Sequence, residues 1–538
     1  MRRSSLLAAS ALALSLVLVP VQAAAQHAHH GTHAPAPAKK PIAKKVVKKA
    51  APKKAVAKKP VAKKAAAKKA VAKKRVVKKA PAPPVQAEPV HQHADPVAAP
   101  APEAVHQHAD PAAAVPMTTN APPAVTDHGD HSIHTDGTPI TPAAAADPHA
   151  GHNMLGGALG TYPMNREASG TAWQPDTSTH TILMRTTGDW TLMGHGMLSL
   201  VYDRQGGPRG DEKVFVPGML MGMARRPIGS GTLQFKAMIS PDPLMGKSGY
   251  PLLLASGETA DGVEHLIDRQ HPHDFFMELS ASVSQNIGPK SSAFVYAGLP
   301  GEPAFGPPAF MHREAIMDSP EAPISHHWLD STHIAFGVVT FGLAFGDVRI
   351  EASRFNGREP DENRWDIETG PLDSTALRIS ANPTRNLSLQ ASWAHLVSPE
   401  QLAPDENETR WSASAIYTRG VGARGWWSTT LAWGRRAQDH GTLDAFTLES
   451  AAGLGGWTLF GRAERIETDE LFSAGGHHGP AYDVGKVSAG LLRDFRVARH
   501  VRVGVGGLYA LNFVPGALEP SYGGDPDGAM LFLRLRID

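Results

Sequence analysis

Hydrophobic and polar residues alternate from Trp190 to the C-terminus, in runs of about ten residues, and this pattern limits the fold more than any other feature. A period of two places odd and even side chains on opposite faces of a β-strand. Runs of this length, separated by turn residues, are typical of membrane barrels. The sequence therefore predicts an all-β fold, a transmembrane antiparallel β-barrel of about 16 strands. The expected strands lie near 190–202, 214–225, 232–240, 273–284, 292–299, 333–342, 347–354, 375–382, 387–396, 410–418, 426–434, 445–452, 457–466, 483–493, 500–512 and 529–538.

The connections between these strands differ in length in a regular way. Brief ones, such as 226–231 and 453–456, largely take turns with long polar ones, such as 241–272 and 300–332. Outer-membrane barrels have short periplasmic turns and longer outer loops. The pattern therefore also predicts which end of the barrel faces outward. A soluble all-β protein is the alternative.

The first and last expected strands fit a wall with lipid outside and water inside. Trp190 and Tyr202 stand at the two ends of an apolar band on one face of the first strand. Twelve steps of roughly 3.3 Å, tilted by about 45°, rise about 28 Å, which is close to the thickness of the hydrocarbon core. In the last strand Arg534 alternates with Leu533 and Leu535. We therefore expect the arginine to face a wet lumen.

The N-terminus has the composition of a secretory signal. Residues 1–25 contain two arginines, an apolar run and a site of small residues, as signal peptides do. No apolar run approaches the roughly 20 residues that a membrane helix needs, so we expect insertion by strands alone. The chain has no cysteine, which excludes disulfides and thiolate metal sites.

We expect location in the outer membrane of a Gram-negative bacterium, with residues 26–155 as a periplasmic tail.

The tail has low sequence complexity. Lys-Lys pairs recur nearly every five residues between 39 and 79, spaced by Ala, Val and Pro. Such a segment buries too little apolar surface to offset the entropy lost on ordering, so we expect disorder. Its positive charge predicts contact with anionic cell-wall polymers, and a solvated spacer is the alternative. The export signal argues against nucleic acid as a partner.

The tail is also rich in histidine, with thirteen between positions 26 and 152. Imidazoles on a flexible chain bind borderline divalent metals such as Cu²⁺, Ni²⁺ or Zn²⁺, and we expect loose binding of low specificity. A merely polar linker is the alternative. The candidate ligands in the duplicated sequence His-Gln-His-Ala-Asp-Pro are His91, His93, His106 and His108.

The first three expected strands carry soft metal ligands on one face. Thioether sulfur favours Cu(I) and Ag(I), and imidazole accepts either oxidation state of copper. Arg225 and Lys236 share this face; if they mark the lumen, the ligands line the pore on adjacent strands, where neighbours stand roughly 5 Å apart. Ordinary packing of methionine is the alternative. The ligands, called the methionine ladder below, are Met193, His195, Met197, Met219, Met221, Met223 and Met238.

Two long expected loops carry a second group of candidate ligands. Residues 264–274 and 311–333 are rich in histidines and carboxylates, whose nitrogens and oxygens suit metal ions. Both loops are long enough to fold inward and constrict the pore. A structural network of His and Asp that holds the loops to the wall is an equal alternative. The candidate ligands are His271, His273, Asp274, His312, His326 and His327.

The chain contains five long motifs, at Asn165–Pro175, Tyr202–Gly210, Ile267–Asp274, Gly298–His312 and His326–His333. Together they resemble motifs of a poorly characterised family of proteobacterial outer-membrane β-barrel proteins, whose members are commonly encoded near copper and heavy-metal resistance genes. The resemblance covers about 155–538 and leaves the lysine-rich tail outside. It implies a barrel and a role in metal handling, and it assigns no activity or ligand.

These observations predict that residues 190–538 form an outer-membrane barrel that binds or conducts metal ions and contributes to heavy-metal tolerance. Copper, as Cu(I) or Cu(II), is expected first and Ag(I) next, with no obligatory cofactor and no enzymatic activity. A general diffusion porin with incidental His and Met is the first alternative. An outer-membrane hydrolase using His333 and Ser331 is the second, although no Gly-x-Ser-x-Gly or His-Glu-x-x-His motif supports it. Residues 156–189 are expected to form a plug or an extra strand.

Overall fold

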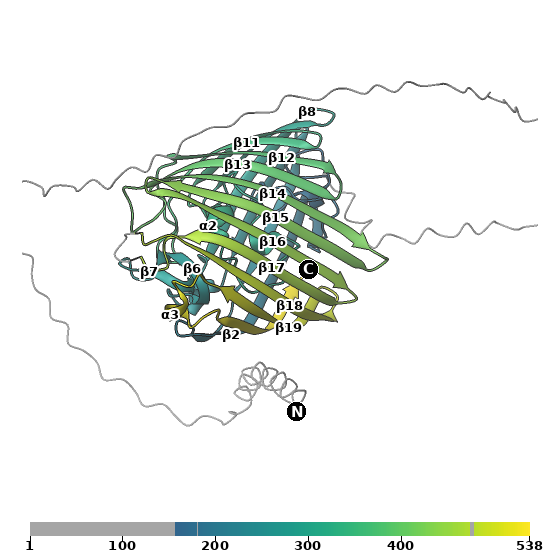
Figure 1. Ribbon diagram of the computed structural model, residues 1–538. Helices are drawn as coiled ribbons and strands as arrows, with labels where there is room; N and C mark the ends of the chain where they lie inside the picture. Colours follow the sequence, from purple (N-terminus) through teal and green to yellow (C-terminus); the bar gives the residue numbers. More distant parts are fainter. Residues whose placement is uncertain (1–155, 180, 474–477) are drawn as a thin grey trace, which may run out of the picture. The chain divides into compact units, whose positions relative to one another are not determined.

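The barrel wall is one antiparallel sheet that closes on itself (Figure 1). The computed structural model describes residues 156–179, 181–473 and 478–538. Strands that follow one another in sequence pair edge to edge, and the first wall strand also pairs with the last. This confirms the predicted 16-strand antiparallel barrel. The predicted signal peptide and tail lie outside the described residues. The wall strands are β2 (Trp190–Gln205), β4 (Gly218–Ile228), β5 (Gly231–Ile239), β8 (Phe276–Gly288), β9 (Ser291–Gly298), β10 (Val338–Phe345), β11 (Val348–Phe355), β12 (Ser374–Thr384), β13 (Leu387–Val397), β14 (Asn407–Val421), β15 (Gly425–Gln438), β16 (Gly441–Leu454), β17 (Trp457–Thr468), β18 (Tyr482–Ala498), β19 (Val501–Phe513) and β20 (Asp527–Ile537).

Two further short strands, β1 and β3, each continue the path of a wall strand and add no new position around the barrel. β1 (Leu183–Thr187) pairs with the start of β2, and β20 pairs with the rest of β2, so β1 continues the line of β20. On the other side of β2, β3 (Glu212–Phe215) precedes β4 in the same way. An extra strand therefore exists within residues 156–189, where a plug or an extra strand was expected, and the even number of wall strands is preserved.

The remaining elements lie in the connections between wall strands, except η1, which lies in the segment before the wall. β6 and β7 form a hairpin inside the predicted loop 241–272, and the sequence pattern did not predict it. In Figure 1 this hairpin and α3 lie at the same end of the barrel. No helix in the described ranges has the length and apolar character that crossing a membrane requires. The elements are η1 (Met164–Arg166), η2 (Asp242–Met245), β6 (Tyr250–Thr259), β7 (His265–Gln270), η3 (Phe310–His312), α2 (His326–Leu329), η4 (Ser331–His333) and α3 (Glu519–Tyr522).

The predicted strands all overlap wall strands, and the differences lie at their ends. The strand predicted from 333 begins at Val338, because the preceding residues wind into η4. Short turns and long connections alternate around the wall, with one exception. The β15–β16 connection consists of Asp439 and His440 alone, although it lies at the end of the long loops.

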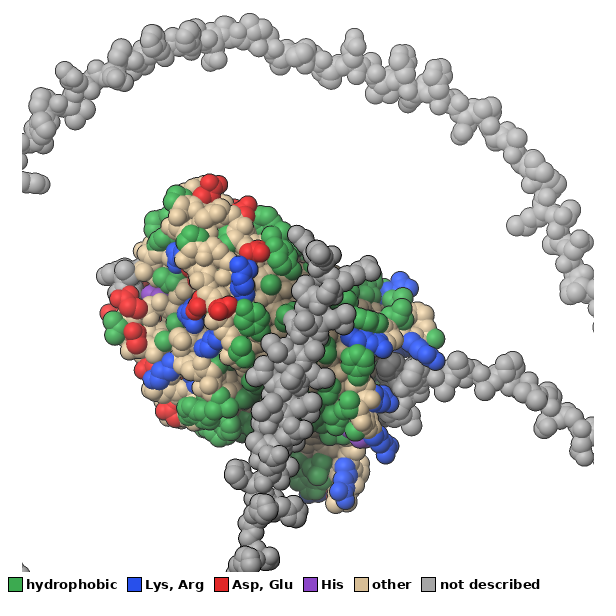
Figure 2. All heavy atoms as spheres, turned by 90° about the horizontal axis from the view of Figure 1, so that it is seen from below, with side chains coloured by type: hydrophobic (Ala, Val, Ile, Leu, Met, Phe, Trp, Pro, Cys, Tyr) green, Lys and Arg blue, Asp and Glu red, His purple; other side chains and the backbone are tan. Residues whose placement is uncertain are grey.

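The two faces of the wall differ as a membrane barrel requires. On β12, Leu377 and Ile379 are 48% and 47% exposed, whereas Arg378 and Ser380 are 2% exposed. Arg534 on β20 is also buried, as predicted for a side chain that faces the lumen. Apolar side chains cover much of the outer surface visible in Figure 2. A soluble protein buries its apolar side chains instead, so the wall is that of a transmembrane barrel.

The connection 299–337 crosses the interior of the barrel. Trp328 on α2 donates an Nε1–H bond to the carbonyl oxygen of Leu443 on β16 (3.1 Å). Arg313 binds Glu449 of the same strand through two hydrogen bonds of 2.7 Å. β16 lies six strands from β10 around the wall. The connection therefore reaches the opposite side of the lumen.

Residues 156–179 also lie inside, against the inner face of β4 and β5. Arg225 donates a hydrogen bond to the carbonyl oxygen of Gly156 (3.0 Å). Lys236 donates another to the carbonyl oxygen of Gly170 (2.9 Å). Because both side chains belong to the buried face of the wall, the segment occupies the lumen in the position of a plug.

Glu302 lies buried beneath Gly170 of this segment. Burial raises the pKa of Glu302 to about 8, from an ordinary value of 4.5. The pKa of Glu302 is higher in the folded protein than in the unfolded chain. The contribution of its protonated side chain to stability is therefore fully present below the ordinary pKa and is lost as pH rises through the folded pKa. We expect a rise from pH 5 to 8 to weaken docking of residues 156–179 by up to about 1.4 kcal/mol per pH unit. Hydrogen exchange of the segment measures this, and Glu302→Gln should flatten the profile; an equally steep profile in that variant would contradict the assignment.

The interior of the barrel is filled with protein. Arg313, Arg349 and Glu449 point inward and are at most 1% exposed. A water-filled channel would leave such side chains in contact with water. Buried charges must be paired, and Arg313 also binds Asp330 (2.6 Å). In the described parts of the chain, the connection 299–337 and the N-terminal segment together close the lumen around these ion pairs.

Candidate metal-binding sites in the lumen

The methionine ladder lies on the inner face of β2, β4 and β5. Opposed side chains on antiparallel strands have Cβ atoms about 5 Å apart, so two sulfurs, or a sulfur and an imidazole, can reach one ion without moving the backbone. The register thus places the ladder's donors in opposed pairs. The pairs are Met193 with Met223, His195 with Met221, Met197 with Met219 and Met221 with Met238.

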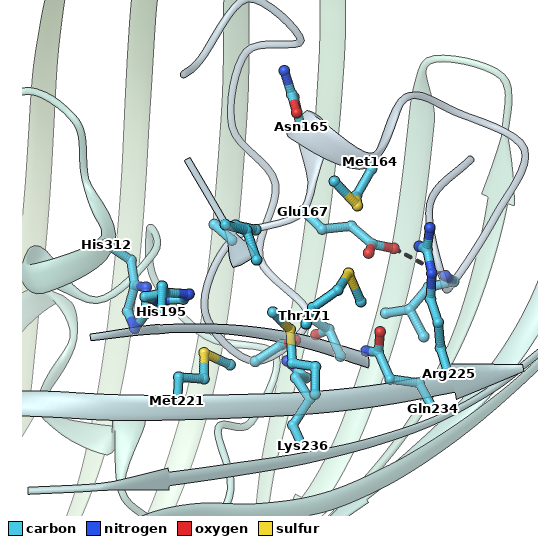
Figure 3. A pocket seen from close by; sticks show the side chains of 16 residues that line it. Met164, Asn165, Glu167, Thr171, His195, Met221, Arg225, Gln234, Lys236 and His312 are labelled. Atoms are coloured by element: carbon cyan, nitrogen blue, oxygen red, sulfur yellow. Dashed lines mark hydrogen bonds between the residues drawn. The ribbon is translucent and has the colours of Figure 1, made fainter. Parts of the chain in front are cut away.

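A cavity of about 70 Å³ lies against the inner side of the ladder (Figure 3). The ladder supplies one histidine, His195, to its lining, and η3 supplies a second, His312. Their ring centroids lie 6.3 Å apart and the rings are nearly perpendicular. Nδ1 of His195 is buried and has no hydrogen-bond partner among the described residues. The sulfurs come from Met164 on η1 and from the ladder residues Met193, Met221 and Met223.

A second cavity, of about 60 Å³, is lined by Met197 and Met219 of the ladder and by residues of the β5–β8 and β9–β10 connections. His271 and His273 come from the connection between β7 and β8, and both side chains are largely buried. Thioethers and imidazoles therefore line this cavity as well. Its methionines are Met197, Met219, Met311 and Met317.

Methionine is concentrated in this part of the lumen. Ten of the sixteen methionines in the chain line the two cavities or belong to the buried cluster beside them. The alternation of side chains along a strand can identify only those methionines that lie on wall strands. Those outside the predicted ladder come from elements that approach one another only in the folded chain. The ten are Met164, Met193, Met197, Met219, Met221, Met223, Met238, Met277, Met311 and Met317.

Five histidines of the β5–β8 and β9–β10 connections form a continuous group; four are buried, and the side chain of His273 is 12% exposed. The centroid distances are 5.3 Å for His273 and His333, 5.2 Å for His326 and His333, and 5.8 Å for His326 and His327. His271 lies 5.9 Å from His327. The sequence did not show that the two loops meet, and the structure brings them together. His333, which belongs both to the histidine-rich loop 311–333 and to the candidate hydrolytic pair, lies between His273 and His326.

Hydrogen bonds fix the orientation of three of these rings. Nδ1 of His273 lies 2.8 Å from Asp242, and Nδ1 of His326 lies 2.8 Å from Asp330. Nδ1 of His333 lies 2.6 Å from the carbonyl oxygen of Asp330. Metal-binding histidines are commonly held in this way, which leaves Nε2 free for the ion. Nε2 of His273 and of His333 is buried without a hydrogen-bond partner in the described ranges.

The same histidines do not form a closed three-ligand site. No three of their ligand atoms lie within 4.8 Å of one another in the described part of the chain. An ion here would take two of the nitrogens, or a nitrogen and a sulfur of the adjoining cavity. Asp274, a predicted oxygen ligand, lies in an ion pair with Arg364 (3.2 Å), which is the structural alternative considered for these loops.

The candidate hydrolytic pair is not assembled. The hydroxyl of Ser331 accepts a hydrogen bond from Arg410 (2.7 Å), and Nδ1 of His333 lies against the carbonyl oxygen of Asp330. Each side chain therefore has another partner. This arrangement gives His333 no role as a base for Ser331.

No protein-family model and no curated protein matches the chain, so the resemblance to proteins encoded near metal-resistance genes stays a prediction. The chain is similar to solved structures of barrels. They include OmpF of Salmonella typhi in complex with daunomycin (10% identity, TM-score 0.41, covering 66% of this chain and 100% of that chain). An anion-selective porin from Comamonas acidovorans is 14% identical, with a TM-score of 0.37, and the match covers 65% of this chain and 99% of that chain. OmpT of Vibrio cholerae is 10% identical, with a TM-score of 0.37, and the match covers 66% of this chain and 100% of that chain. The fold assignment rests on the strand pairing above, and no function is transferred from these proteins.

Proposed function

We propose that the chain is an outer-membrane barrel that binds Cu(I) or Ag(I) in its lumen and so contributes to heavy-metal tolerance. One observation carries the proposal. Methionine and histidine side chains of the wall, the N-terminal segment and the inward connections converge on two adjacent buried cavities.

The chemistry of these cavities suits a soft monovalent cation. A thioether is an uncharged soft donor, and a neutral imidazole binds copper in either oxidation state. Because the chain has no cysteine, only methionine can supply sulfur. Packing alone would explain buried methionines. It does not explain why His195 faces the same cavity with an unpartnered Nδ1, as it does among the described residues.

The charges at the long-loop end favour the approach of cations. The connections 398–406, 469–481 and 514–526 contain Asp and Glu but no Lys or Arg, whereas short turns carry Lys290 and Arg424. In Figure 2 Asp and Glu lie toward the left of the view, where Lys and Arg also occur, whereas the right side shows Lys and Arg alone. Surfaces of one charge concentrate ions of the opposite sign. With long loops facing outward, an anionic end would meet the external medium.

The tail forms a second part of the proposal, carried by its sequence alone. His91, His93, His106 and His108 would hold borderline divalent metals loosely on the periplasmic side. The lysine repeats between 39 and 79 would keep this segment near anionic cell-wall polymers. Both stretches lie outside the described residues.

The closed lumen separates the proposal from a general diffusion porin. A porin needs a continuous aqueous path, whereas Arg313 and Glu449 form a buried ion pair across this lumen. The connection 299–337 lines both cavities, so its displacement would let a bound ion leave. Binding with gated release therefore fits the interior better than free diffusion does.

A growth experiment tests the physiological part of the proposal. A strain that lacks the gene should tolerate less copper and silver than its parent. The wild-type gene should restore growth, whereas a gene in which Met193, Met197, Met219, Met221 and Met223 are changed to Leu should not, provided that both barrels reach the outer membrane in equal amounts. Full rescue by the variant would refute a role of the ladder in tolerance.

A further inference from the structure

Three neighbouring hairpins at the long-loop end bring together a set of nitrogen and oxygen ligands outside the lumen. Glu406 ends the β13–β14 connection, His440 lies in the β15–β16 turn, and Asp469 and His478 lie in the β17–β18 connection. The two imidazoles are close, with ring centroids 4.2 Å apart. None of these residues belongs to the sites proposed above.

The two imidazoles lie between two carboxylates. Nδ1 of His440 and Nε2 of His478 lie 3.6 and 3.7 Å from Oε2 of Glu406. The opposite ring nitrogens lie 3.1 and 3.4 Å from the carboxylate of Asp469. One carboxylate therefore faces one nitrogen of each ring, and the second carboxylate faces the other.

We propose that Glu406, His440 and His478 bind a divalent cation of borderline character, with Zn²⁺ as the reference ion. Oε2 of Glu406 faces Nδ1 of His440 and Nε2 of His478, and the three residues each offer one ligand atom within 4.8 Å of the other two. Water fills the fourth position of a tetrahedral site, since the side chains of His440 and Glu406 are 34% and 39% exposed. The inference goes beyond the proposed function: the ligands are harder than thioethers and the site lies at a different place.

The distances fit ligands of one ion better than they fit hydrogen bonds. A separation of 3.6 Å is too long for a hydrogen bond. Two ligands each about 2.05 Å from a tetrahedral zinc ion lie about 3.3 Å apart, so the two separations from Oε2 of Glu406 need to close by only a few tenths of an ångström. Oε2 of Glu406 and Nε2 of His478 are buried and have no hydrogen-bond partner among the described residues.

Asp469 acts as the positioning residue of this site. It is 5% exposed and lies against the ring nitrogens that point away from the proposed ion. A carboxylate in this position fixes the ring orientation and strengthens the imidazole as a ligand. Because the ligands come from three hairpins, a bound ion would also hold the hairpins together.

A network of ion pairs without metal is the competing explanation. The carboxylate of Asp469, 3.4 Å from Nδ1 of the ring, raises the pKa of His478 to about 9, which favours a protonated ring when no ion is bound. A zinc ion and that proton compete for the same ring. The two explanations therefore differ in one observable, which is whether the chain takes up zinc at this place.

Zinc uptake by the full-length protein in detergent tests the proposal. Protein is dialysed at a series of buffered free zinc concentrations, and bound zinc is measured by mass spectrometry. Glu406→Gln and His440→Gln should each bind one zinc ion per chain fewer than the wild type. Asp469→Asn should keep that ion but bind it about 10- to 100-fold more weakly. The tail contributes equally to all variants, so the differences report on the hairpins.

Matched controls and a second readout keep the test decisive. His500→Gln, in a short turn, and Glu519→Gln, in another long-loop connection, should leave zinc binding unchanged. Heat-modifiable gel mobility establishes that each barrel is folded. Zinc should also slow hydrogen exchange of residues 398–406 in the wild type and not in His440→Gln. Wild-type zinc stoichiometry and affinity in both Glu406→Gln and His440→Gln would overturn the proposal and leave an ion-pair network only.

Discussion

Changing Met193, Met197, Met219, Met221 and Met223 to leucine is expected to weaken Cu(I) and Ag(I) binding by the full-length protein about 100-fold, or about 2.8 kcal/mol. Leucine has nearly the volume of methionine, so the lumen stays filled. The change removes the soft donors from the wall side of both cavities. Competition with a chelator of known affinity measures the effect in detergent.

The controls for this experiment separate ligation from packing. Met530 on β20 is also buried and points inward, but it lies in a different apolar cluster. Met530→Leu should therefore leave affinity unchanged. Volume-conserving exchanges of this kind usually cost less than about 1.5 kcal/mol each, and heat-modifiable mobility shows whether the barrel is intact. Equal affinity in the five-fold variant and the wild type would mean that the ladder only packs the lumen.

Replacing Arg313 by methionine is expected to open the closed lumen. Arg313 binds Glu449 on the wall and Asp330 within the connection 299–337, and all three are buried. Removing one partner of a buried ion pair costs about 3–5 kcal/mol, because the other charge stays uncompensated. The two carboxylates would then repel one another. We expect the connection to detach from β16 and ion conductance in planar bilayers to rise well above that of the wild type.

An exposed ion pair on the same barrel provides the matched control. Arg465 binds Asp483 at 2.6 Å, and both side chains are more than half exposed. Solvent screening makes such pairs contribute little, so Arg465→Met should leave conductance and stability as they are. Wild-type conductance in Arg313→Met would show that this ion pair does not hold the lumen closed.

The wall could be predicted from sequence because its signal is local. In a strand, neighbouring side chains point to opposite faces. Because one face of the wall contacts lipid and the other faces the interior, apolar and polar residues alternate along each strand. For the same reason the side of Met193, His195 and Met197 could be assigned from the arginine and lysine on the adjacent strands. The structure places all three on the inner face, as that reasoning required.

The interior could not be predicted because its contacts are distant in sequence. Met164 and Met317 reach the ladder from elements with no periodic pattern of their own. β6 and β7 pair through registers broken by irregularities, which blur the alternation that marks a strand. Successive residues of the proposed zinc site, Glu406, His440 and His478, are more than thirty residues apart in sequence. They come together only because their three hairpins are neighbours in the folded wall.

X-ray absorption at the copper edge of Cu(I)-loaded, full-length protein tests the central claim most directly. Because the chain has no cysteine, any sulfur bound to copper must come from methionine. We predict a copper–sulfur signal in the wild type and in Met530→Leu, and its loss in the variant that lacks the five ladder methionines. A spectrum with nitrogen and oxygen neighbours only, or an unchanged sulfur signal in that variant, would contradict copper binding by the ladder.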